Sequence, residues 1–464
     1  MRSVPHPAAQ RRSRRRIAGA TLLVASVFVA ACGGDDDSSD ATSAPSTSAT
    51  ATPATTTAGS TAAPDDTSGV PAGDGDLRSI LGLQASEPGD GVDFDLGGVF
   101  AMSGAGSYYG QAQLNGAQLA VDQIKAAGGP NINLVVKDHK SGDAQTGAAV
   151  TRELGTSGVS ATLASYAAVG GSMLPVIEQY KILTLDGAGG TARVFNSKPY
   201  FWGTRTEQVA GYYEGILKYT DEKLPDAKTA AYIAYDSGPD LNKLSEDTLR
   251  ETLASHGIDL NLVVFHPGGT TDFSAIMTQL ASEQPDIVFA TEIGLDAGYF
   301  MKQYNASGLT GQVIGAQYTP DAAEVAGSDY DKYWFASEWF DATNPTSAFS
   351  KQFVDTFQAE YGTAPDFYSA NAYDDVFKVW QLIRQVTAAG GDITSGEQLQ
   401  DALMADPTFQ TVYGGDDTNV GTIVLDLDTH SVEKKTLGLF SAADGQAAAL
   451  AYFAYGGADF VLVK

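Results

Sequence analysis

The stretch FDLGGVFAMSGAGSYYGQAQLNGAQLAVDQIKAAGGP, residues 94–130, combines an apolar run, a glycine-rich turn and an amphipathic segment in immediate succession. The run 94–100 is typical of a buried strand. From 110 to 127 apolar residues such as Leu114 and Ala117 recur at helical spacing, and Pro130 follows the glycines that end the pattern. The stretch therefore predicts a strand that leads directly into a helix.

The same alternation recurs along the chain in two runs. In the first run we expect strands at 132–138, 161–165 and 182–185 and helices at 144–154 and 173–180. In the second run, which begins near residue 207, we expect strands at 229–235, 260–265, 286–291 and 313–316 and helices at 241–254, 272–280 and 295–306, followed later by a helix at 373–383. Such alternation builds right-handed units around a parallel sheet. We therefore expect an α/β fold with two lobes, each a parallel sheet flanked by helices, and a ligand cleft between them.

Three strand-to-helix turns of the first run, at 102–110, 163–171 and 185–191, are rich in small residues. Ligands of such sheets lie at the carboxyl ends of the strands, and small residues leave backbone N–H groups open to an anion. We therefore expect these turns to hold a carboxylate or another accepting group. The first turn is not a dinucleotide fingerprint, because Tyr109 stands at the third glycine position.

The composition excludes several classes of protein. The chain has 56 acidic and 28 basic residues, a formal net charge of −28, and residues 1–31 hold arginines but no acid. Such a surface repels phosphate backbones, so we expect no nucleic-acid partner. No histidine has a second histidine at metal spacing, and no nucleophile elbow or phosphate-binding loop is present. We therefore predict a binding protein with no catalytic residue, metal or cofactor, rather than an enzyme.

The N-terminal segment predicts export and anchoring. Arginines at 11–16 precede the apolar run 17–31, which is shorter than the ~20 residues of a membrane-spanning helix, so residues 1–31 are typical of a signal peptide. Cys32 is the only cysteine in the chain, and a cysteine after small residues resembles a bacterial lipobox. We expect cleavage before Cys32, lipidation of its thiol and display on the outer face of the cell membrane. An ordinary secreted protein is the alternative.

Residues 32–76 predict a disordered tether after the anchor. From residue 33 onward they are almost entirely Ala, Ser, Thr, Pro, Gly and Asp, without an aromatic residue, Lys or Arg. Such a segment cannot bury enough apolar area to offset its chain entropy. A flexible chain of this length spans about 40 Å on average, which would lift the folded part away from the membrane surface.

Five segments resemble the leucine/isoleucine/valine-binding protein family, the type I periplasmic binding proteins that feed ABC importers. They are GVFAMSGAGSYYGQAQLNGAQLAVDQIKAAGG (98–129), ASYAAVGGSMLPVIEQYKILTLDGAGG (164–190), TAAYIAYDSGPD (229–240), HPGGTTDFSAIMTQLASEQPDIVFA (266–290) and VIGAQY (313–318). The resemblance implies two lobes joined by three crossings of the chain. The first lobe would comprise 93–205 and 339–432, and the second 206–338 and 433–464.

The resemblance also implies where a ligand binds. In relatives that bind amino acids, the carboxylate meets the second and third turns, and an aromatic side chain of the first turn packs nearby. The acid that holds the ammonium group matches Gln317, with Glu292 as a possible substitute, and the tyrosine of the second lobe is replaced near Asp240. The predicted ligand-binding residues are Ser103, Tyr109, Ser165, Tyr166, Ala167, Ala168, Gly187, Gly189, Gly190, Thr191, Asp240, Glu292 and Gln317.

The resemblance predicts an extracytoplasmic solute-binding protein of an ABC importer that works by hinge closure, with ABC permease subunits as partners. The sequence departs from the family at Tyr166-Ala167-Ala168, where a serine pair is common, and at Gly190, where a threonine is common. The expected ligand is therefore an amino acid or a similar small polar molecule, such as an amide, a urea-like compound or a small carboxylate. The alternatives are a sensor lipoprotein that presents its ligand to a signalling partner and a secreted hydrolase.

Overall fold

The computed structural model describes residues 76–189, 198–206, 208–416, 418–432, 435–442, 447–454 and 460–463, all of which belong to the unit that spans 67–464. The helices on the first part of the chain are α1 (Leu77–Ile80), α2 (Ser107–Ala126), α3 (Ala144–Ser157), α4 (Ala167–Tyr180), α5 (Gln208–Lys223) and α6 (Pro239–Ser255). They are followed by α7 (Ser274–Glu283), α8 (Leu295–Ala306), α9 (Pro320–Ala326), α10 (Ala348–Tyr361), α11 (Phe367–Ala388) and α12 (Gly396–Ala405).

The first sheet has the strand order β11-β12-β13-β5-β4-β3-β1-β2. Its strands are β1 (Asp93–Phe100), β2 (Asn131–Asp138), β3 (Ala161–Ala164), β4 (Leu183–Asp186), β5 (Phe201–Gly203), β11 (Thr408–Asp416), β12 (Asn419–Asp426) and β13 (Ser431–Val432). The run from β13 to β2 is parallel, whereas β11, β12 and β13 pair antiparallel. The strand–helix alternation thus produces the parallel part, and a late hairpin extends its edge.

The second sheet repeats this plan with the order β16-β15-β14-β10-β9-β8-β6-β7. Its strands are β6 (Thr229–Tyr235), β7 (Asp259–His266), β8 (Ile287–Thr291), β9 (Gln312–Gly315), β10 (Tyr333–Glu338), β14 (Thr436–Ser441), β15 (Ala448–Ala454) and β16 (Phe460–Leu462). The run from β10 to β7 is parallel, and β14, β15 and β16 add antiparallel strands beyond β10. The two-lobed α/β fold is confirmed, but each sheet is mixed rather than purely parallel. None of the antiparallel strands β11 to β16 was predicted, because no helix separates one of these strands from the next.

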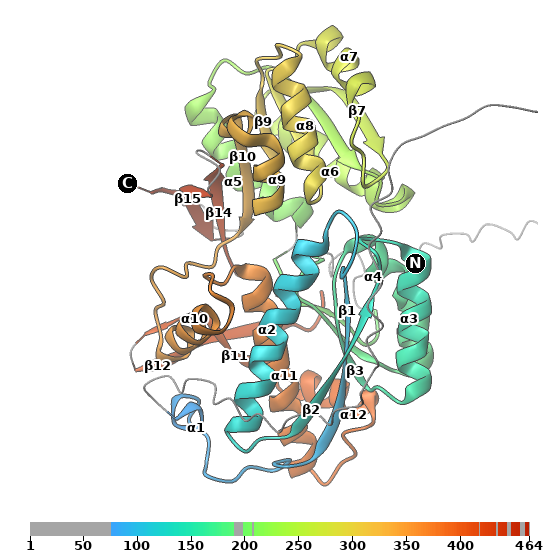
Figure 1. The fold of residues 1–464 in the computed structure, drawn as a ribbon, viewed down its shortest axis with the longest axis vertical. Helices are drawn as coiled ribbons and strands as arrows, with labels where there is room; N and C mark the ends of the chain where they lie inside the picture. The colour runs from blue at the N-terminus through green and yellow to red at the C-terminus, as the bar shows by residue number, and fades with distance from the viewer. Residues whose placement is uncertain are drawn as a thin grey trace, which may run out of the picture. The chain divides into compact units, whose positions relative to one another are not determined.

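Both faces of each sheet are covered. In the first sheet, Leu96 and Phe100 of β1 belong to a core with α2 and α11, whereas Val99 belongs to a second core with α3 and α4. In the second sheet, one core contains residues of α5 and α6, and another contains residues of α7, α8 and α9. Figure 1 shows the helices stacked against the strands in this way. Parallel strands that are buried on both faces read as apolar runs, which is why the sequence pattern identified them.

The helix of the opening stretch packs against a helix from much later in the chain. Figure 1 shows α2 and α11 side by side. A side-chain carbon at Gly116 of α2 would lie only 2.0 Å from the backbone oxygen of Ser369 of α11, so glycine permits this close approach. Asp366 caps α11 by accepting from the backbone N–H of Ser369. The predicted amphipathic helix at 373–383 is therefore the middle of a longer, deeply buried one.

The chain passes between the two sheets three times, after β5, after β10 and after β13. The short helix α1 begins at Asp76, whose side chain accepts from the N–H of Arg78. Leu77 and Leu81 are buried in the core of the first sheet, and Arg78 forms a 2.9 Å ion pair with Asp90. Residues 77–81 therefore pack on the folded unit, and the predicted tether ends just before them.

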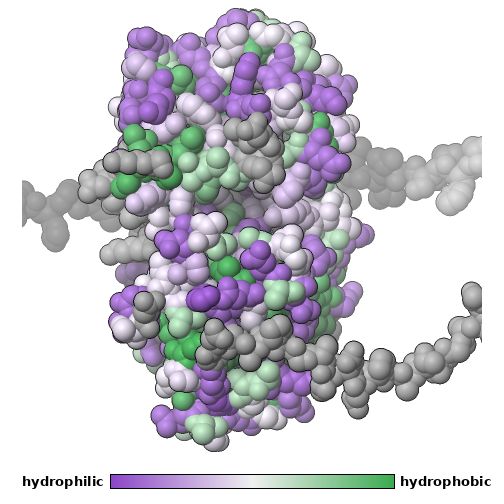
Figure 2. Space-filling model, turned by 60° about the vertical axis from the view of Figure 1, so that its left-hand side comes forward, coloured by the Kyte–Doolittle hydropathy of each residue, from purple (hydrophilic) through white to green (hydrophobic). Residues whose placement is uncertain are grey.

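The face drawn in Figure 2 is a mixture of hydrophilic residues and residues of intermediate hydropathy, and hydrophobic residues form small separate patches on it. No helix within the described part of the chain is long and apolar enough to cross a membrane. The predicted signal peptide and Cys32 lie outside the described residues.

Candidate functional site

A small cavity lies where residues from the ends of strands in both sheets meet; we call it the cleft cavity. It has a free volume of about 20 Å³. It is lined by Tyr109, Tyr166, Ala167, Ala188, Gly189 and Tyr368 from the first lobe and by Tyr235, Ile293 and Gln317 from the second. Tyr166 and Ala188 follow β3 and β4, and Ile293 and Gln317 follow β8 and β9. The cavity therefore occupies the edge where ligands of open α/β sheets bind.

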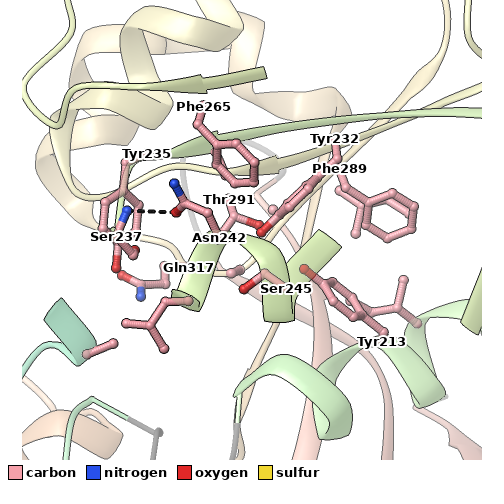
Figure 3. A pocket seen from close by; sticks show the side chains of 17 residues that line it. Tyr213, Tyr232, Tyr235, Ser237, Asn242, Ser245, Phe265, Phe289, Thr291 and Gln317 are labelled. Carbon is pink, nitrogen blue, oxygen red and sulfur yellow. Dashed lines mark hydrogen bonds between the residues drawn. The ribbon is translucent and has the colours of Figure 1, made fainter. Parts of the chain in front are cut away.

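A second cavity, which we call the lobe-two chamber, lies next to the first, on the side of the second lobe. It has a free volume of about 60 Å³ and shares Ala167, Tyr235 and Gln317 with the cleft cavity. Figure 3 shows its lining side chains, with Tyr232, Phe265 and Phe289 extending from strands. The chamber lies between the sheet and the helices α5 and α6, which contribute Tyr213 and Ser245.

The first turn brings the two lobes into direct contact. The Tyr109 hydroxyl oxygen accepts a hydrogen bond of 2.9 Å from the backbone N–H of Gly294, at the start of α8. The N–H of Leu295 lies 3.4 Å from the backbone oxygen of Ala105. A side-chain carbon at Gly294 would lie 1.9 Å from that same oxygen, so only glycine permits the contact. Tyr109 is buried, and burial raises the pKa of its hydroxyl well above the ordinary value.

The second turn holds a tyrosine in a conformation that is rare for non-glycine residues. Tyr166 has a φ of 66°, and its ring lies 5.0 Å from that of His139 and 6.2 Å from that of Tyr109. The Ser165 hydroxyl is 2.9 Å from Nε2 of His139, and Ser165 is fully buried behind the cavity. Burial lowers the pKa of His139 to about 4, so the ring is neutral at pH 7. This turn therefore presents an aromatic wall to the cavity.

The third turn differs from the expectation that its backbone amides are open to a ligand. Oδ1 of Asp186 accepts from the N–H groups of Ala188 and Gly189, at 3.2 and 2.6 Å. The amides at these two positions are therefore already used by a carboxylate of the protein itself. A side-chain carbon at Gly189 would lie 2.2 Å from Oδ2 of Asp186, so bulk at this position would displace the aspartate.

A buried arginine lies behind the third turn, and sequence reasoning missed it. Arg205 is 1% exposed, donates to the backbone oxygen of Ala188 and lies over the rings of Phe367 and Tyr368, at 4.7 and 5.1 Å. It follows β5 without any motif around it, so only the fold brings it behind the lining residues Ala188 and Tyr368. Its positive charge lowers the pKa of the buried Asp186 and so partly offsets the effect of burial on that carboxyl group.

The second lobe contributes a buried cluster of charged groups near the cavity. Glu292 forms a 2.8 Å ion pair with His266, and both side chains are buried. Burial alone lowers the pKa of His266, but the hydrogen bond and charge of Glu292 outweigh it and hold that pKa above its ordinary value. The nearby Asp296 accepts from the N–H of Gly269 at 2.7 Å. Glu292 thus has a partner within the protein, and it does not line either cavity.

Gln317 lies at the junction of the two cavities. Its Oε1 atom is buried and has no hydrogen-bond partner among the described residues. A buried acceptor left without a partner costs roughly 1–3 kcal/mol, so such an atom calls for a specific explanation. A donor group on a bound ligand would supply the missing hydrogen bond.

Of the other predicted residues, the structure places Ser103, Ala168, Gly187 and Asp240 outside the cavity lining. The Ser103 hydroxyl donates to Asp138 at 2.5 Å, Asp240 is exposed at the start of α6, and Ala168 lies one residue beyond the lining residue Ala167. The backbone oxygen of Gly187 accepts from Asn371 at 2.8 Å. Gly190 and Thr191 lie outside the described residues.

Three lining residues were not predicted, namely Tyr235, Ile293 and Tyr368, whereas Ala188 belongs to the third turn, which was predicted to meet the ligand. Tyr235 ends a strand that the sequence pattern did identify, so its position at a strand end was the available signal. Tyr368 is the second residue of α11, far along the chain from the other first-lobe lining residues, and no local pattern marks it. Among the described residues no group of His, Cys, Asp or Glu side chains is placed to hold a metal ion.

Two mixed α/β sheets with a cavity at facing strand ends define a solute-binding architecture of the type I periplasmic kind. Residues 94–454 match the family model for periplasmic binding proteins, and the chain belongs to this family.

Individual relatives agree with the family assignment. The Leu/Ile/Val-binding protein homolog 7 of Brucella abortus is 24% identical over 329 residues, which cover 66% of this chain and 81% of that protein. The branched-chain amino acid transporter substrate binding protein LivJ of Streptococcus pneumoniae, solved with isoleucine, is 25% identical with a TM-score of 0.65, covering 77% of this chain and 98% of LivJ. A solute binding protein of an ABC transporter from R. palustris, solved with benzoate, shares the fold at 19% identity and a TM-score of 0.64, covering 77% of this chain and 95% of that one.

Proposed function

We propose that this periplasmic binding protein is the solute-binding component of an ABC importer and that it closes on an amino acid or a similar small polar ligand. The observation that carries the proposal is the cleft cavity, whose lining comes from both lobes. A ligand in the cleft cavity contacts both lobes only when the lobes are closed on each other. It therefore stabilises the closed arrangement by its differential affinity for that state.

The ligands of similar proteins support a small carboxylate. LivJ was solved with isoleucine and the R. palustris protein with benzoate, and both compounds carry one carboxylate on a small apolar body. In this chain the positive charge of Arg205 lies behind the first-lobe wall of the cavity, and Gln317 offers an acceptor from the second lobe. We therefore expect a ligand that directs a carboxylate toward the first lobe and a donor toward Gln317.

The N-terminal sequence supports display outside the cell. Cys32 would carry a lipid and residues 33–76 would connect the anchor to the binding unit, within reach of permease subunits in the same membrane. The protein would then work by binding and closure and would catalyse no reaction.

A thermal-shift screen of amino acids, aromatic acids, amides and urea tests the proposal. A ligand present at a hundred times its Kd stabilises the folded state by about 2.7 kcal/mol, which raises the Tm measurably. Small-angle scattering of the protein with and without each hit should then show a smaller radius of gyration with ligand. If no compound raises the Tm, or a confirmed ligand leaves the radius unchanged, the proposal is wrong. Loss of uptake of that ligand on deletion of the gene would separate an importer from a sensor.

A further inference from the structure

A larger space lies beside the second crossing between the lobes, which follows β10; we call it the hinge groove. It has a free volume of about 690 Å³, and small-molecule sites typically measure about 300–1,000 Å³. Residues 364–368 line it from the first lobe, residues of α9 and β10 from the second, and residues 340–343 from the crossing itself. Tyr368 is the one described residue that lines both the hinge groove and the cleft cavity, so the two spaces are separate.

The charged residues of this lining are all acidic. They are Glu324, Glu338, Asp341 and Asp366, and none of the described residues that line the groove is Lys, Arg or His. Two of these acids already have partners, because Glu338 pairs with Lys435 at 2.6 Å and Asp366 caps α11. Glu324 and Asp341 form no ion pair within the described part of the chain. Their charges therefore favour a cation in the groove.

Aromatic side chains form much of the rest of the lining. Tyr318 and Phe340 are only partly buried and offer ring surface to an occupant. The rings of Phe367 and Tyr368 already have a cation, because the guanidinium of Arg205 lies over them outside the lining. Aromatic rings attract cations within about 6 Å of their centroids and also bury apolar groups. The rings and the carboxylates thus favour the same kind of occupant, a cation with an apolar body.

A buried hydroxyl in the groove lacks a partner. Ser337 is 3% exposed, and its Oγ atom has no hydrogen-bond partner among the described residues. Ser337 and Phe335 are two residues apart on β10, so their side chains point to the same face of the sheet, and both line the groove. Buried polar groups normally have partners. An ammonium group in the groove would supply one, because its N–H groups can donate to Oγ.

We propose that the hinge groove is a second binding site, for an organic cation that carries a primary ammonium group on an aromatic body. The ammonium group would donate to Ser337 and be attracted by the carboxylates of Asp341 and Glu324. The aromatic body would pack against Tyr318 and Phe340. Because this site is separate from the cleft cavity, the inference does not depend on the proposed function.

Calorimetric titration with 2-phenylethylamine and 2-phenylethanol tests the site. The two compounds share a ring and a two-carbon chain, but only the amine is charged at pH 7. The amine should bind at least tenfold more tightly than the alcohol, because hydrogen bonds and ring contacts are stronger for a charged group. Its affinity should also decrease as salt is added, since salt screens the carboxylates. Equal affinity of the two compounds, or no binding of the amine, would overturn the site.

Asp341→Asn tests the charge and has a close control elsewhere in the chain. The Asp341 carboxylate accepts from the backbone N–H and the hydroxyl of Thr343, at 3.0 and 2.6 Å. The exposed Asp392 accepts from the same two groups of Thr394, at 2.9 and 2.7 Å, and does not line the groove. Asp341→Asn should weaken the amine by about two- to fivefold and leave the alcohol unchanged. Asp392→Asn should leave the affinity for both compounds unchanged.

Ser337→Ala tests the hydrogen bond. The variant should weaken the amine by between about twofold and tenfold. Its Tm without a ligand should not fall, because Oγ has no hydrogen-bond partner to lose among the described residues. If neither Ser337→Ala nor Asp341→Asn weakens the amine, the amine binds elsewhere and the inference is wrong. Either variant alone decides the question if the other does not fold.

The outcomes for the two sites are independent. If the amine binds and both groove variants weaken it, the hinge groove is a cation site even when no compound of the thermal-shift screen binds in the cleft. If a compound of that screen binds and compacts the protein while the amine does not bind, the inference is wrong and the proposed function stands.

Discussion

The Tyr109 hydroxyl and the backbone N–H of Gly294, 2.9 Å apart, form a buried hydrogen bond between the first and second lobes. Tyr109 lies in the first turn of α2, and Gly294 precedes α8. Because Tyr109 also lines the cleft cavity, one side chain contacts both the ligand space and the opposite lobe. A hydrogen bond of this kind stabilises only the arrangement in which the lobes meet.

Tyr109→Phe should therefore weaken ligand binding while leaving each lobe folded. Loss of one hydrogen bond corresponds to between about twofold and tenfold in affinity, measured by calorimetry. Tyr361→Phe is the matched control, because the Tyr361 hydroxyl donates to Asn115 at 3.0 Å within the first lobe. The control should lower the free energy of unfolding and leave affinity unchanged. Equal affinity of wild type and Tyr109→Phe would show that this contact plays no part in closure.

Gln317→Leu should weaken a ligand that carries a donor group by about five- to a hundredfold, because a buried unpaired donor costs roughly 1–3 kcal/mol. A ligand without a donor group should bind the variant about as well as the wild type. This second ligand is therefore the control for the first. The Tm without ligand should not fall, since Oε1 has no partner to lose among the described residues. Equal weakening of both kinds of ligand would contradict a specific role for Gln317.

Asp186 and Asp296 should each contribute stability that decreases as the pH rises from about 4 to 7. Burial raises the pKa of Asp186 from 3.8 to about 6, despite the hydrogen bonds from Gly189 and Ala188, and burial likewise raises the pKa of Asp296 to about 6. The folded chain thus holds these protons more tightly than the unfolded chain. The stabilisation is fully present below about pH 4 and is lost as the pH rises through 6, roughly 3 kcal/mol for Asp186.

Asp186→Asn tests this assignment, because asparagine keeps an acceptor for the turn but does not ionise. The Tm of the wild type relative to that of the variant should decrease between pH 4 and pH 7. Asp401→Asn, at an exposed position on α12, should retain the wild-type slope. Identical slopes for wild type and Asp186→Asn would show that Asp186 ionises at its ordinary pKa.

A buried polar network connects the segments that cross between the lobes. Glu338 ends β10, and Lys435 follows β13; their charged groups are 2.6 Å apart and almost fully buried. Asn371 of α11 donates to Glu338 at 3.0 Å and to the backbone oxygen of Gly187 at 2.8 Å. Thr204, which follows β5, donates to Asp375 of the same helix at 2.9 Å. Helix α11 therefore contacts all three crossings.

Lys435→Met should lower the free energy of unfolding in urea by about 3–5 kcal/mol, because it leaves the Glu338 carboxylate buried without its cation. The double variant Lys435→Met with Glu338→Gln should recover most of that loss. Lys351→Met removes an exposed lysine that pairs with Asp355 and should change stability by less than about 1 kcal/mol. If Lys435→Met lowers the free energy of unfolding by no more than the Lys351→Met control does, water must reach the Glu338–Lys435 pair.

Cys32→Ser should release the protein from the cell membrane. Cys32 is the only thiol in the chain and directly follows the small residues that end the predicted signal peptide. Fractionation of cells that express the wild type or the variant should place the wild type with membranes and the variant in the soluble fraction. A variant that stays with the membranes would rule out this thiol as the anchor.

The sequence by itself determined the fold class and the edge at which the site lies. Apolar runs followed by amphipathic segments are local patterns, and local patterns suffice to predict parallel strands that helices cover on both faces. The glycine-rich turns could be located in the same way, so Tyr109, Tyr166 and Gly189 were predicted near the ligand and do line the cleft cavity. Their part in binding remains a prediction.

Only the tertiary structure decided which polar groups are available to a ligand. The sequence predicted that the backbone N–H groups of Ala188 and Gly189 are open to a ligand. In the structure both donate to the carboxylate of Asp186, because this residue ends the four-residue strand β4 and its side chain lies over the turn that follows. Glu292 is paired with His266, because β8 and β7 both flank β6 and end at the same edge of the sheet. Oε1 of Gln317 is left without a hydrogen-bond partner among the described residues. Such pairings depend on strand order and on side chains that are distant in sequence, which no local pattern records.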